Sequence, residues 1–357
     1  MRWELSAEQA DFRSVLADWL TEVCAPETLR SWLDAGDHGA FEERFAADGW
    51  FGVGSPEDLG GEGGGLVELA LAAEELGRRG APSSAWLGSM LALPALARDA
   101  EAAKTLLADG MTTVLAVPSG AAPNGRHALA GDGGLRGAIS TVLAATRARR
   151  FVVPVEDGTL QLVEAGQDAV RVHGRELTDR TRTVGDVEFD GVHGTTIPGD
   201  AAEVLEQAAL RAAVLVSADA LGVMERMLDE TVEYAGQRRQ FGVPIGSFQA
   251  VKHAAAEMLV KVESARSIVY LAAASVEAGL DDAPLHAAAA KAQVCGAAAV
   301  AADTALTLHG AIGYTWEHDL QIFYKRAKLD AQLFGSVAEW NERLAARLEL
   351  LPGMSQG

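Results

Sequence analysis

The 357-residue sequence contains little cysteine and little positive charge. Its two cysteines, Cys24 and Cys295, lie far apart, which excludes a disulfide framework and a cysteine-rich zinc site. The chain has 30 Lys and Arg and 50 Asp and Glu, which gives a formal net charge of −20. Neither nucleic acid nor an anionic membrane is therefore expected as a general partner. We expect a reduced, cytoplasmic location. Any anionic ligand needs a local basic site.

Several familiar motifs are also missing. The glycine-rich stretch at 55–65 lacks the Lys-Ser/Thr of a phosphate-binding loop and is predicted to be a structural turn. The eight histidines show no HExxH or other paired spacing, so no metal site is expected. There is no G-x-S-x-G motif that would indicate a serine nucleophile. The N-terminus carries acidic residues and no apolar signal region, and no stretch reaches the uncharged length of a transmembrane segment.

Hydrophobic patterning divides the chain into three expected domains. Residues 1–110 form an N-terminal α-helical domain, 111–200 a shortened middle β domain, and 201–357 a C-terminal four-helix bundle domain. The predicted strands are short, β-branched runs at 112–117, 137–145, 150–155, 159–165 and 183–192. The predicted bundle helices lie at about 202–237, 248–279, 284–308 and 323–350. The expected fold class is α+β.

One stretch, RRQFGVPIGSFQ at 238–249, places basic and aromatic residues at a tight break between two long helices. The planar guanidinium of Arg238 suits a diphosphate, and the helix that opens after Gly246 offers free N–H groups. Arginine in the last turn of a helix is also favourable simply as a cap. From these residues alone, both interpretations stay open.

Four strings together resemble the acyl-CoA dehydrogenase family over nearly the whole chain. They are SPEDLGGEGGGLVELALAAEELGR (55–78), GDVEFDGV (185–192), RRQFGVPIGSFQAVKH (238–253) and LHGAIGYTWEHDLQIFYKRAKL (308–329). The last looks most like members from actinobacterial steroid and lipid catabolism. The resemblance implies a helical domain, a β domain and a four-helix bundle. It also implies FAD as cofactor, α,β-dehydrogenation of an acyl-CoA thioester, oligomers, and electron-transferring flavoprotein as the electron acceptor.

The resemblance also implies site residues. Arg238 falls where the family's arginine reaches the FAD pyrophosphate, often of a neighbouring subunit, and Phe241 falls near the adenine. Gln249 matches another cofactor-side position. In the turn after the third bundle helix, Gly310 and Gly313 would let the backbone approach a partner's FAD, with Thr307 in place of the family's glutamine; a plain helix-ending turn is the alternative. Ser336 is the remaining cofactor candidate.

The resemblance fails where the chemistry needs a base. The family's glutamate, which removes the α-proton, aligns with Phe334, and the position used by other members falls near Ala212. The catalytic residues are therefore unknown. The flavin-binding segments of the β domain also depart from the family, at AVPSGAAPNG (116–125) and AISTVLAATRA (138–148).

This pattern predicts a subunit that lacks the catalytic Glu in a heteromeric acyl-CoA dehydrogenase. The half of the FAD site that a subunit builds for itself looks degraded, whereas the half lent to a neighbour is kept. Three alternatives remain. They are a complete homomeric enzyme whose base is Glu317, Asp319 or Asp330, a flavin monooxygenase on the same fold, and a cofactor-free scaffold.

Overall fold

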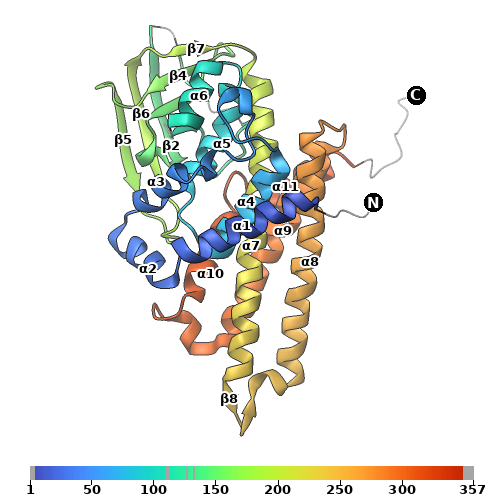
Figure 1. The fold of residues 1–357 in the computed structure, drawn as a ribbon. Helices are drawn as coiled ribbons and strands as arrows, with labels where there is room; N and C mark the ends of the chain where they lie inside the picture. The colour runs from blue at the N-terminus through green and yellow to red at the C-terminus, as the bar shows by residue number, and fades with distance from the viewer. Residues whose placement is uncertain (1–4, 110–111, 126–127, 132, 349–357) are drawn as a thin grey trace, which may run out of the picture.

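The computed structural model describes residues 5–109, 112–125, 128–131 and 133–348. Short helices from the first third of the chain lie beside two small sheets, and long helices run from the sheets toward a hairpin at the opposite end of the molecule (Figure 1). The described order is α, then β, then α, as expected. Whether the three regions are separate domains with the expected boundaries stays a prediction.

The N-terminal region contains six helices among the described residues: α1 (Ala7–Val23), α2 (Pro26–Ala35), α3 (Gly39–Ala47), α4 (Leu66–Arg79), α5 (Ser84–Leu96) and α6 (Ala100–Asp109). Helix α2 was not predicted, although Pro26 at its start and left-handed Gly36 at its end are ordinary helix signals. The Leu/Ala-rich stretch at 85–109 predicts helical structure throughout, but the structure has two separate helices there, α5 and α6. The Asp99 carboxylate accepts a hydrogen bond from the Ala102 N–H at 3.2 Å and so starts α6.

The middle region forms two sheets. In one, β1 (Thr113–Leu115) pairs parallel with β3 (Arg150–Pro154), and the order continues through β4 (Leu160–Glu164) to β7 (Thr195–Ile197). The other sheet has the order β2 (Leu135–Leu143), β6 (Val184–Val192), β5 (Val170–Arg175). Strands β5 and β7 were missed. The first is mostly exposed and polar, and the second has only three residues, so neither shows a hydrophobic run.

The C-terminal region is built on three long helices, α7 (Ala201–Gln237), α8 (Gln249–Glu277) and α9 (Ala283–His309). The fourth helix, expected at 323–350, is instead α10 (Leu320–Asp330) and α11 (Val337–Ala345). The backbone turns sharply at the break. Phe334 and Gly335 adopt positive φ angles of 56° and 105°, and Ser336 then caps α11 with a capping box.

Close packing joins the N-terminal helices to the bundle. Helices α4 and α7 cross at Gly77 and Gly222, where an added Cβ would lie 2.2 Å from the Asp219 carbonyl oxygen and 1.8 Å from that of Glu74, respectively. Only glycine allows this backbone approach. Periodicity does not reveal this crossing, because a single glycine in a helical run is compatible with several arrangements.

A buried ionic cluster ties all three regions together. Arg326 of α10 donates to the Asp219 carboxylate of α7 at 2.8 Å and to the Ala81 carbonyl oxygen at 2.7 Å, and Arg182 lies 2.9 Å from the same carboxylate. Although burial alone would raise it, the two arginines lower the pKa of Asp219 to about 2. Burial and the Asp219 charge raise the pKa of neighbouring Asp330. Removing one partner of such a cluster costs about 3–5 kcal/mol.

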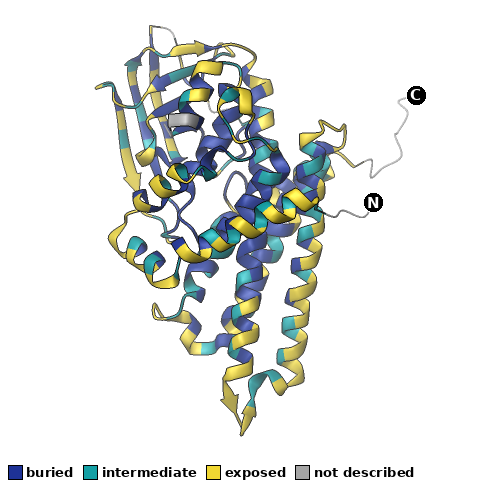
Figure 2. Cartoon of the chain, in the orientation of Figure 1, coloured by how far each residue is buried: buried dark blue, intermediate teal, exposed yellow. Residues whose placement is uncertain are grey.

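By length and composition alone, two helical stretches could cross a membrane, so the expectation that none is long enough was too strict. In the stretch 201–237, 83% of the most apolar window is buried inside the protein, as in the core helix of a globular protein. In the stretch 283–314, only 39% of the most apolar window is buried inside the protein. The apolar run at 284–310 predicts a helix that is buried on nearly all sides, so α9 is more exposed than its pattern indicates. The lower parts of the long helices show exposed residues along their length (Figure 2).

Candidate functional site

The structure divides the predicted cofactor residues into three groups. Arg238, Phe241 and Gln249 lie at the hairpin between α7 and α8, and all three are exposed. Thr307, Gly310 and Gly313 lie at the C-terminal end of α9 and in the following 3-10 turn, η5 (Gly310–Tyr314). Ser336 stands apart, at the start of α11. The hairpin forms the far tip of the molecule (Figure 1).

The hairpin has a tight turn with an unusual residue in it. Strands β8 (Arg239–Gln240) and β9 (Val243–Pro244) are joined by Phe241 and Gly242, whose φ angles are 52° and 82°. A two-residue turn with both φ angles positive favours Asn-Gly, and a phenylalanine in it is strained by about 1–3 kcal/mol. Phe241 is nevertheless 93% exposed, with only an edge contact to Phe248 at 6.2 Å. Its position is not explained by packing within the chain.

Arg238 is held by its backbone and leaves its side chain available. Its N–H donates to the Tyr234 carbonyl oxygen at 2.8 Å, and its own carbonyl oxygen accepts from the Ile245 N–H at 2.8 Å. Within the described part of the chain, its guanidinium has no hydrogen bond or ion pair. By contrast, neighbouring Arg239 donates to the Gly242 carbonyl oxygen at 3.3 Å. The Arg238 side chain therefore does not cap α7.

In the η5 turn the two glycines differ. Gly310 has a φ of 64° and nothing within 4 Å of an added Cβ, so its surface is open. At Gly313 an added Cβ would lie 3.1 Å from both His309 and Leu306, so this glycine is required by packing within the chain. The Thr307 hydroxyl is exposed and donates to the Asp303 carbonyl oxygen at 2.8 Å.

Aromatic stacking places the first two groups at the same end of the bundle. His309, the last residue of α9, stacks on Tyr234 of α7 with ring centroids 4.5 Å apart. Tyr234 is one helical turn before Arg238. Burial lowers the pKa of His309, which keeps the stacked ring neutral at physiological pH.

Ser336 is occupied by a structural role. Its hydroxyl accepts from the Glu339 N–H at 3.2 Å and donates to the Glu339 carboxylate at 2.9 Å. The backbone hydrogen bond between Phe334 and Ser119 places this loop against the β region, whereas the hairpin is at the far tip (Figure 1). The structure does not bring Ser336 together with Arg238.

The segments that correspond to the family's flavin-binding and base-bearing loops contact each other directly. The Ser119 N–H donates to the Thr141 carbonyl oxygen at 3.0 Å, and the Ser119 carbonyl oxygen accepts from the Phe334 N–H at 2.6 Å. We call these three segments the closed junction: 117–122, 139–144 and 331–336. Phe334 is 2% exposed. A ligand could enter between these backbones only by breaking the hydrogen bonds that join them.

Lys291 of α9 stabilises the closed junction through hydrogen bonds. The sequence analysis did not identify this residue. Its Nζ donates to the carbonyl oxygens of Asp330 and Gly335, at 2.7 and 3.2 Å, and is completely buried. The Trp340 indole donates to the Phe334 carbonyl oxygen at 3.0 Å. A single lysine inside the apolar run 284–310 was the available signal, because a buried lysine requires polar partners.

The carboxylates considered as displaced bases have other roles or lie at the surface. Asp319 accepts from Arg30 at 2.6 Å, and Glu317 is exposed. Asp330 is completely buried beside Asp219. At the alternative base position, Ala212 is completely buried as well.

Comparison with known proteins decides the family. Residues 6–105 match the acyl-CoA dehydrogenase N-terminal domain, and residues 202–348 match the acyl-CoA dehydrogenase C-terminal domain. The chain belongs to the acyl-CoA dehydrogenase family. The acyl-CoA dehydrogenase IpdE2 of Mycolicibacterium smegmatis is 31% identical over 96% of this chain and 100% of its own length. IpdE2 of Mycobacterium tuberculosis is 33% identical over 96% of this chain and 97% of its own.

Solved structures agree with this assignment. The ChsE4-ChsE5 complex of Mycobacterium tuberculosis contains a chain with a TM-score of 0.85 and 27% identity, covering 99% of this chain and 100% of that one. A butyryl-CoA dehydrogenase of Megasphaera elsdenii, 21% identical over 97% of this chain and 99% of its own, shows the same fold with a TM-score of 0.88. The predicted family, fold and oxidoreductase class are therefore confirmed. FAD is the typical cofactor of this family.

Proposed function

We propose that this chain is the subunit without a catalytic Glu in a cytoplasmic, heteromeric acyl-CoA dehydrogenase. One contrast carries the proposal. The segments that align with the family's flavin-binding loops form the closed junction, whereas Arg238 and Phe241 are exposed, and no contact among the described residues accounts for their positions. A strained, exposed aromatic residue at a turn is typical of a functional contact. The free, buried state of Cys24 and Cys295 supports the cytoplasmic location.

We call the hairpin between α7 and α8, together with the end of α9 and the η5 turn, the bundle end. Its residues fit the adenosine diphosphate part of FAD held by a partner. The unpartnered Arg238 guanidinium suits the diphosphate, since a fork of N–H donors matches phosphate oxygens. Phe241 offers an exposed ring face to the adenine. Gln249 begins α8 beside them, while Gly310 and Thr307 present an open surface nearby. Gly313 would support this surface only indirectly, and Ser336 lies apart from it.

The closed junction does not fit the flavin ring, so no reaction step is assigned to it. When bound, FAD supplies the hydride acceptor. The partner would hold the ring and the base that removes the α-proton of the acyl-CoA. Two similar structures have paired names, the ChsE4-ChsE5 complex and the Tcur3481-Tcur3483 steroid ACAD, the second with 25% identity and a TM-score of 0.83. These pairs support a heteromeric assembly and a bulky, steroid-derived acyl-CoA as substrate.

The deciding experiment is the visible spectrum of the purified chain, alone and co-expressed with an acyl-CoA dehydrogenase-like partner. We expect a colourless chain and a yellow pair with about one FAD per pair of subunits. A yellow single chain that oxidises an acyl-CoA would contradict the proposal in favour of a complete homomeric enzyme. Flavin activity that requires NADH and oxygen would indicate a monooxygenase. A chain that stays colourless with every partner would indicate a scaffold.

The same preparation tests the electron acceptor. We propose electron-transferring flavoprotein, because it is the acceptor implied by family membership. Acyl-CoA oxidation by the yellow pair should then reduce purified electron-transferring flavoprotein. Turnover only with oxygen would contradict this part of the proposal and leave the subunit arrangement intact.

A further inference from the structure

Three aromatic rings connect the elements that make up the bundle end. Tyr234 of α7 stacks on His309 of α9, with ring centroids 4.5 Å apart and ring planes 21° apart. His318, which precedes α10, meets the His309 ring edge-on, with centroids 4.9 Å apart. We call these three rings the stacked cluster. It joins α7, the end of α9 and the segment before α10.

The stacked cluster is linked through the backbone to predicted cofactor residues. The Tyr234 carbonyl oxygen accepts the N–H of Arg238 at 2.8 Å. His309 directly precedes Gly310, and His318 follows the η5 turn, so the two histidines bracket that turn. The backbone of Arg238 and the η5 turn are therefore positioned relative to each other through these rings.

Hydrogen bonds fix where each neutral histidine ring carries its proton. The His309 Nδ1 lies 2.8 Å from the Ala305 carbonyl oxygen and must donate, because that oxygen only accepts. Its Nε2 is therefore unprotonated in the neutral ring, and it is buried without a hydrogen-bond partner among the described residues. The His318 Nδ1 accepts the Leu320 N–H at 3.1 Å. A proton added to the His309 Nε2 would find no acceptor and would place a charge beside His318.

The charged groups around the stacked cluster do not favour a charged His309. Burial lowers the pKa of His309, the Ala305 carbonyl oxygen raises it, and the charge of His318 lowers it. The pKa of His318 is lowered by burial, raised by Asp319 and lowered by Arg30. On α7, burial raises the pKa of Glu230 to about 7, so this acid takes up a proton as well when the pH falls. The stack of His309 on Tyr234 therefore depends on the neutral imidazole.

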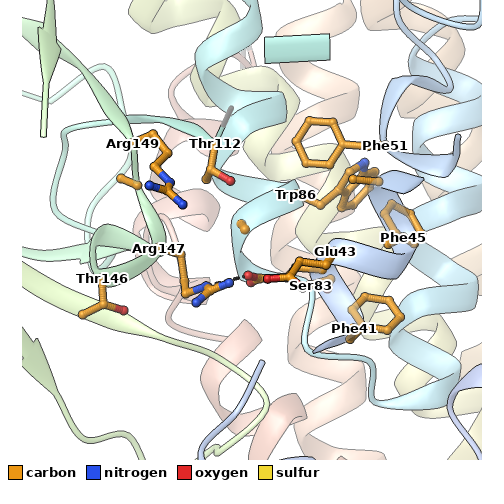
Figure 3. A pocket seen from close by; sticks show the side chains of 14 residues that line it. Phe41, Glu43, Phe45, Phe51, Ser83, Trp86, Thr112, Thr146, Arg147 and Arg149 are labelled. Atoms are coloured by element: carbon orange, nitrogen blue, oxygen red, sulfur yellow. Dashed lines mark hydrogen bonds and ion pairs between the residues drawn. The ribbon is translucent and has the colours of Figure 1, made fainter. Parts of the chain in front are cut away.

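A second aromatic cluster provides a comparison. Phe41, Phe45 and Trp86 lie beside a cavity of about 530 Å³ that is also lined by residues 146–149 (Figure 3). The Phe45 centroid lies 5.5 Å from that of Phe41 and 6.4 Å from that of Trp86, and all three side chains are nearly fully buried. These rings join only α3 and α5 of the N-terminal region. They pack the core, whereas the stacked cluster lies next to exposed cofactor candidates.

We propose that the stacked cluster positions Arg238 and the η5 turn for a partner's FAD, and that protonation of His309 releases them. The inference rests on the proposed function, because it concerns the regulation of the same bundle end. His309 is 3% exposed, so it acts through Gly310 and Tyr234 and does not contact the cofactor. Tyr234 acts in the same way through the backbone of Arg238. Both are positioning residues.

Hydrogen exchange of the purified full chain at pH 7.5 tests the positioning without any flavin. Tyr234→Leu removes the stacked ring, so the amides of 238–245 and 310–314 should exchange about 2- to 10-fold faster, the usual worth of an aromatic pair. Tyr234→Phe keeps the ring and should exchange like the unaltered chain. Phe45→Leu is the matched control, because it removes a ring from the other cluster and should leave both segments unchanged.

The same measurement at pH 5.0, corrected for intrinsic exchange rates, tests the protonation. The unaltered chain should exchange about 2- to 10-fold faster in both segments than at pH 7.5. His309→Phe keeps a ring that takes up no proton, so its exchange should be the same at both pH values. His173→Phe makes the same substitution at an exposed histidine of β5 and should behave like the unaltered chain.

FAD retention by the co-expressed pair after gel filtration is the second readout. At pH 7.5 the pair with Tyr234→Leu should bind FAD about 2- to 10-fold less tightly, and Tyr234→Phe should restore the affinity. At pH 5.0 the pair with His309→Phe should retain more FAD than the unaltered pair.

The two readouts separate this inference from the proposed function. Equal exchange in Tyr234→Leu and the unaltered chain, equal effects of Tyr234→Leu and Phe45→Leu, or the same acid response in His309→Phe would overturn the inference alone. A pair that binds FAD equally well in every variant would do the same. A pair that binds no FAD would contradict the proposed function, and the inference with it.

Discussion

The closed junction and the bundle end each contain a phenylalanine with a positive φ angle, but it is buried in the first region and exposed in the second. In the closed junction, Ser119 hydrogen-bonds to two other segments, and Phe334 is buried at a positive φ. At the bundle end, Phe241 also has a positive φ but is almost fully exposed. The same backbone strain is offset by burial and hydrogen bonds in the first case, whereas the second has only the edge contact of Phe241 with Phe248 among the described residues. The comparison indicates which half of a shared site this chain retains.

Both regions contain acidic residues whose pKa values are shifted. Near the closed junction, two buried arginines lower the pKa of Asp219 to about 2. Toward the bundle end, burial raises the pKa of Glu230 to about 7, because Arg226 compensates it only in part. Asp330, beside Asp219, also has a raised pKa because of burial and the Asp219 charge, so each region contains an acid that its neighbours compensate only in part.

The largest effect is expected from Phe334→Glu, which places a carboxylate at the position of the family's base. Phe334 is 2% exposed and its backbone is bonded to Ser119, so the carboxylate has no solvent and no substrate beside it. We expect the free energy of unfolding at pH 8 to fall by about 3–5 kcal/mol, with no dehydrogenase activity in the single chain. Denaturant unfolding and an acyl-CoA assay measure both.

Phe334→Leu is the matched control, since it keeps an apolar side chain and should lower stability by less than half as much. If Phe334→Glu gained dehydrogenase activity in the single chain, the junction would open in solution and the comparison would fail.

Arg238→Met tests the bundle end. Loss of a charged contact to a diphosphate costs about 1.5–3 kcal/mol, so the co-expressed pair should hold FAD about 10- to 100-fold less tightly. The stability of the single chain should not change, because the side chain has no partner in the described structure. Flavin content after dialysis and the unfolding curve are the measurements. Arg239→Met, one residue along, should retain FAD; equal loss in both variants would show that only net charge matters.

The smallest effect is expected from Glu230→Gln. The pKa of Glu230 is raised from 4.5 to about 7 in the folded chain, so the folded state retains a proton that the unfolded state loses between these values. Stability therefore falls as pH rises from about 4.5 through 7. At pH 8 the free energy of unfolding of the variant should be about 1–2 kcal/mol higher than that of the unaltered chain. At pH 5 the two should differ little.

The exposed Glu257 of α8, which does not act on the pKa of Glu230, provides the control, and Glu257→Gln should not alter the pH profile. Identical profiles for Glu230→Gln and the unaltered chain would show that the carboxyl group of Glu230 is solvated in the folded chain.

Much of the fold was readable from the sequence because its signals are local. The long helices at 202–237, 248–279 and 284–308 agree with α7, α8 and α9 within a few residues, since each is bounded by Gly, Pro or Asp. The helix expected at 323–350 was wrong. Its break at Phe334 depends on hydrogen bonds to Ser119 and Lys291, far away in the sequence. Apolar periodicity continues across such a break, so patterning alone does not show it.

The sequence by itself determined the family, the order of regions and the absence of a carboxylate at Phe334 and Ala212, because these depend on residue identity and short-range motifs. Only the tertiary structure decided which candidate residues are available. It engaged the Ser336 side chain in a helix cap, packed Gly313 against its neighbours and left Arg238 and Phe241 exposed. It also stacked His309 on Tyr234 at the bundle end. Exposure and contact depend on residues distant in the chain, and a side chain's identity does not specify what surrounds it.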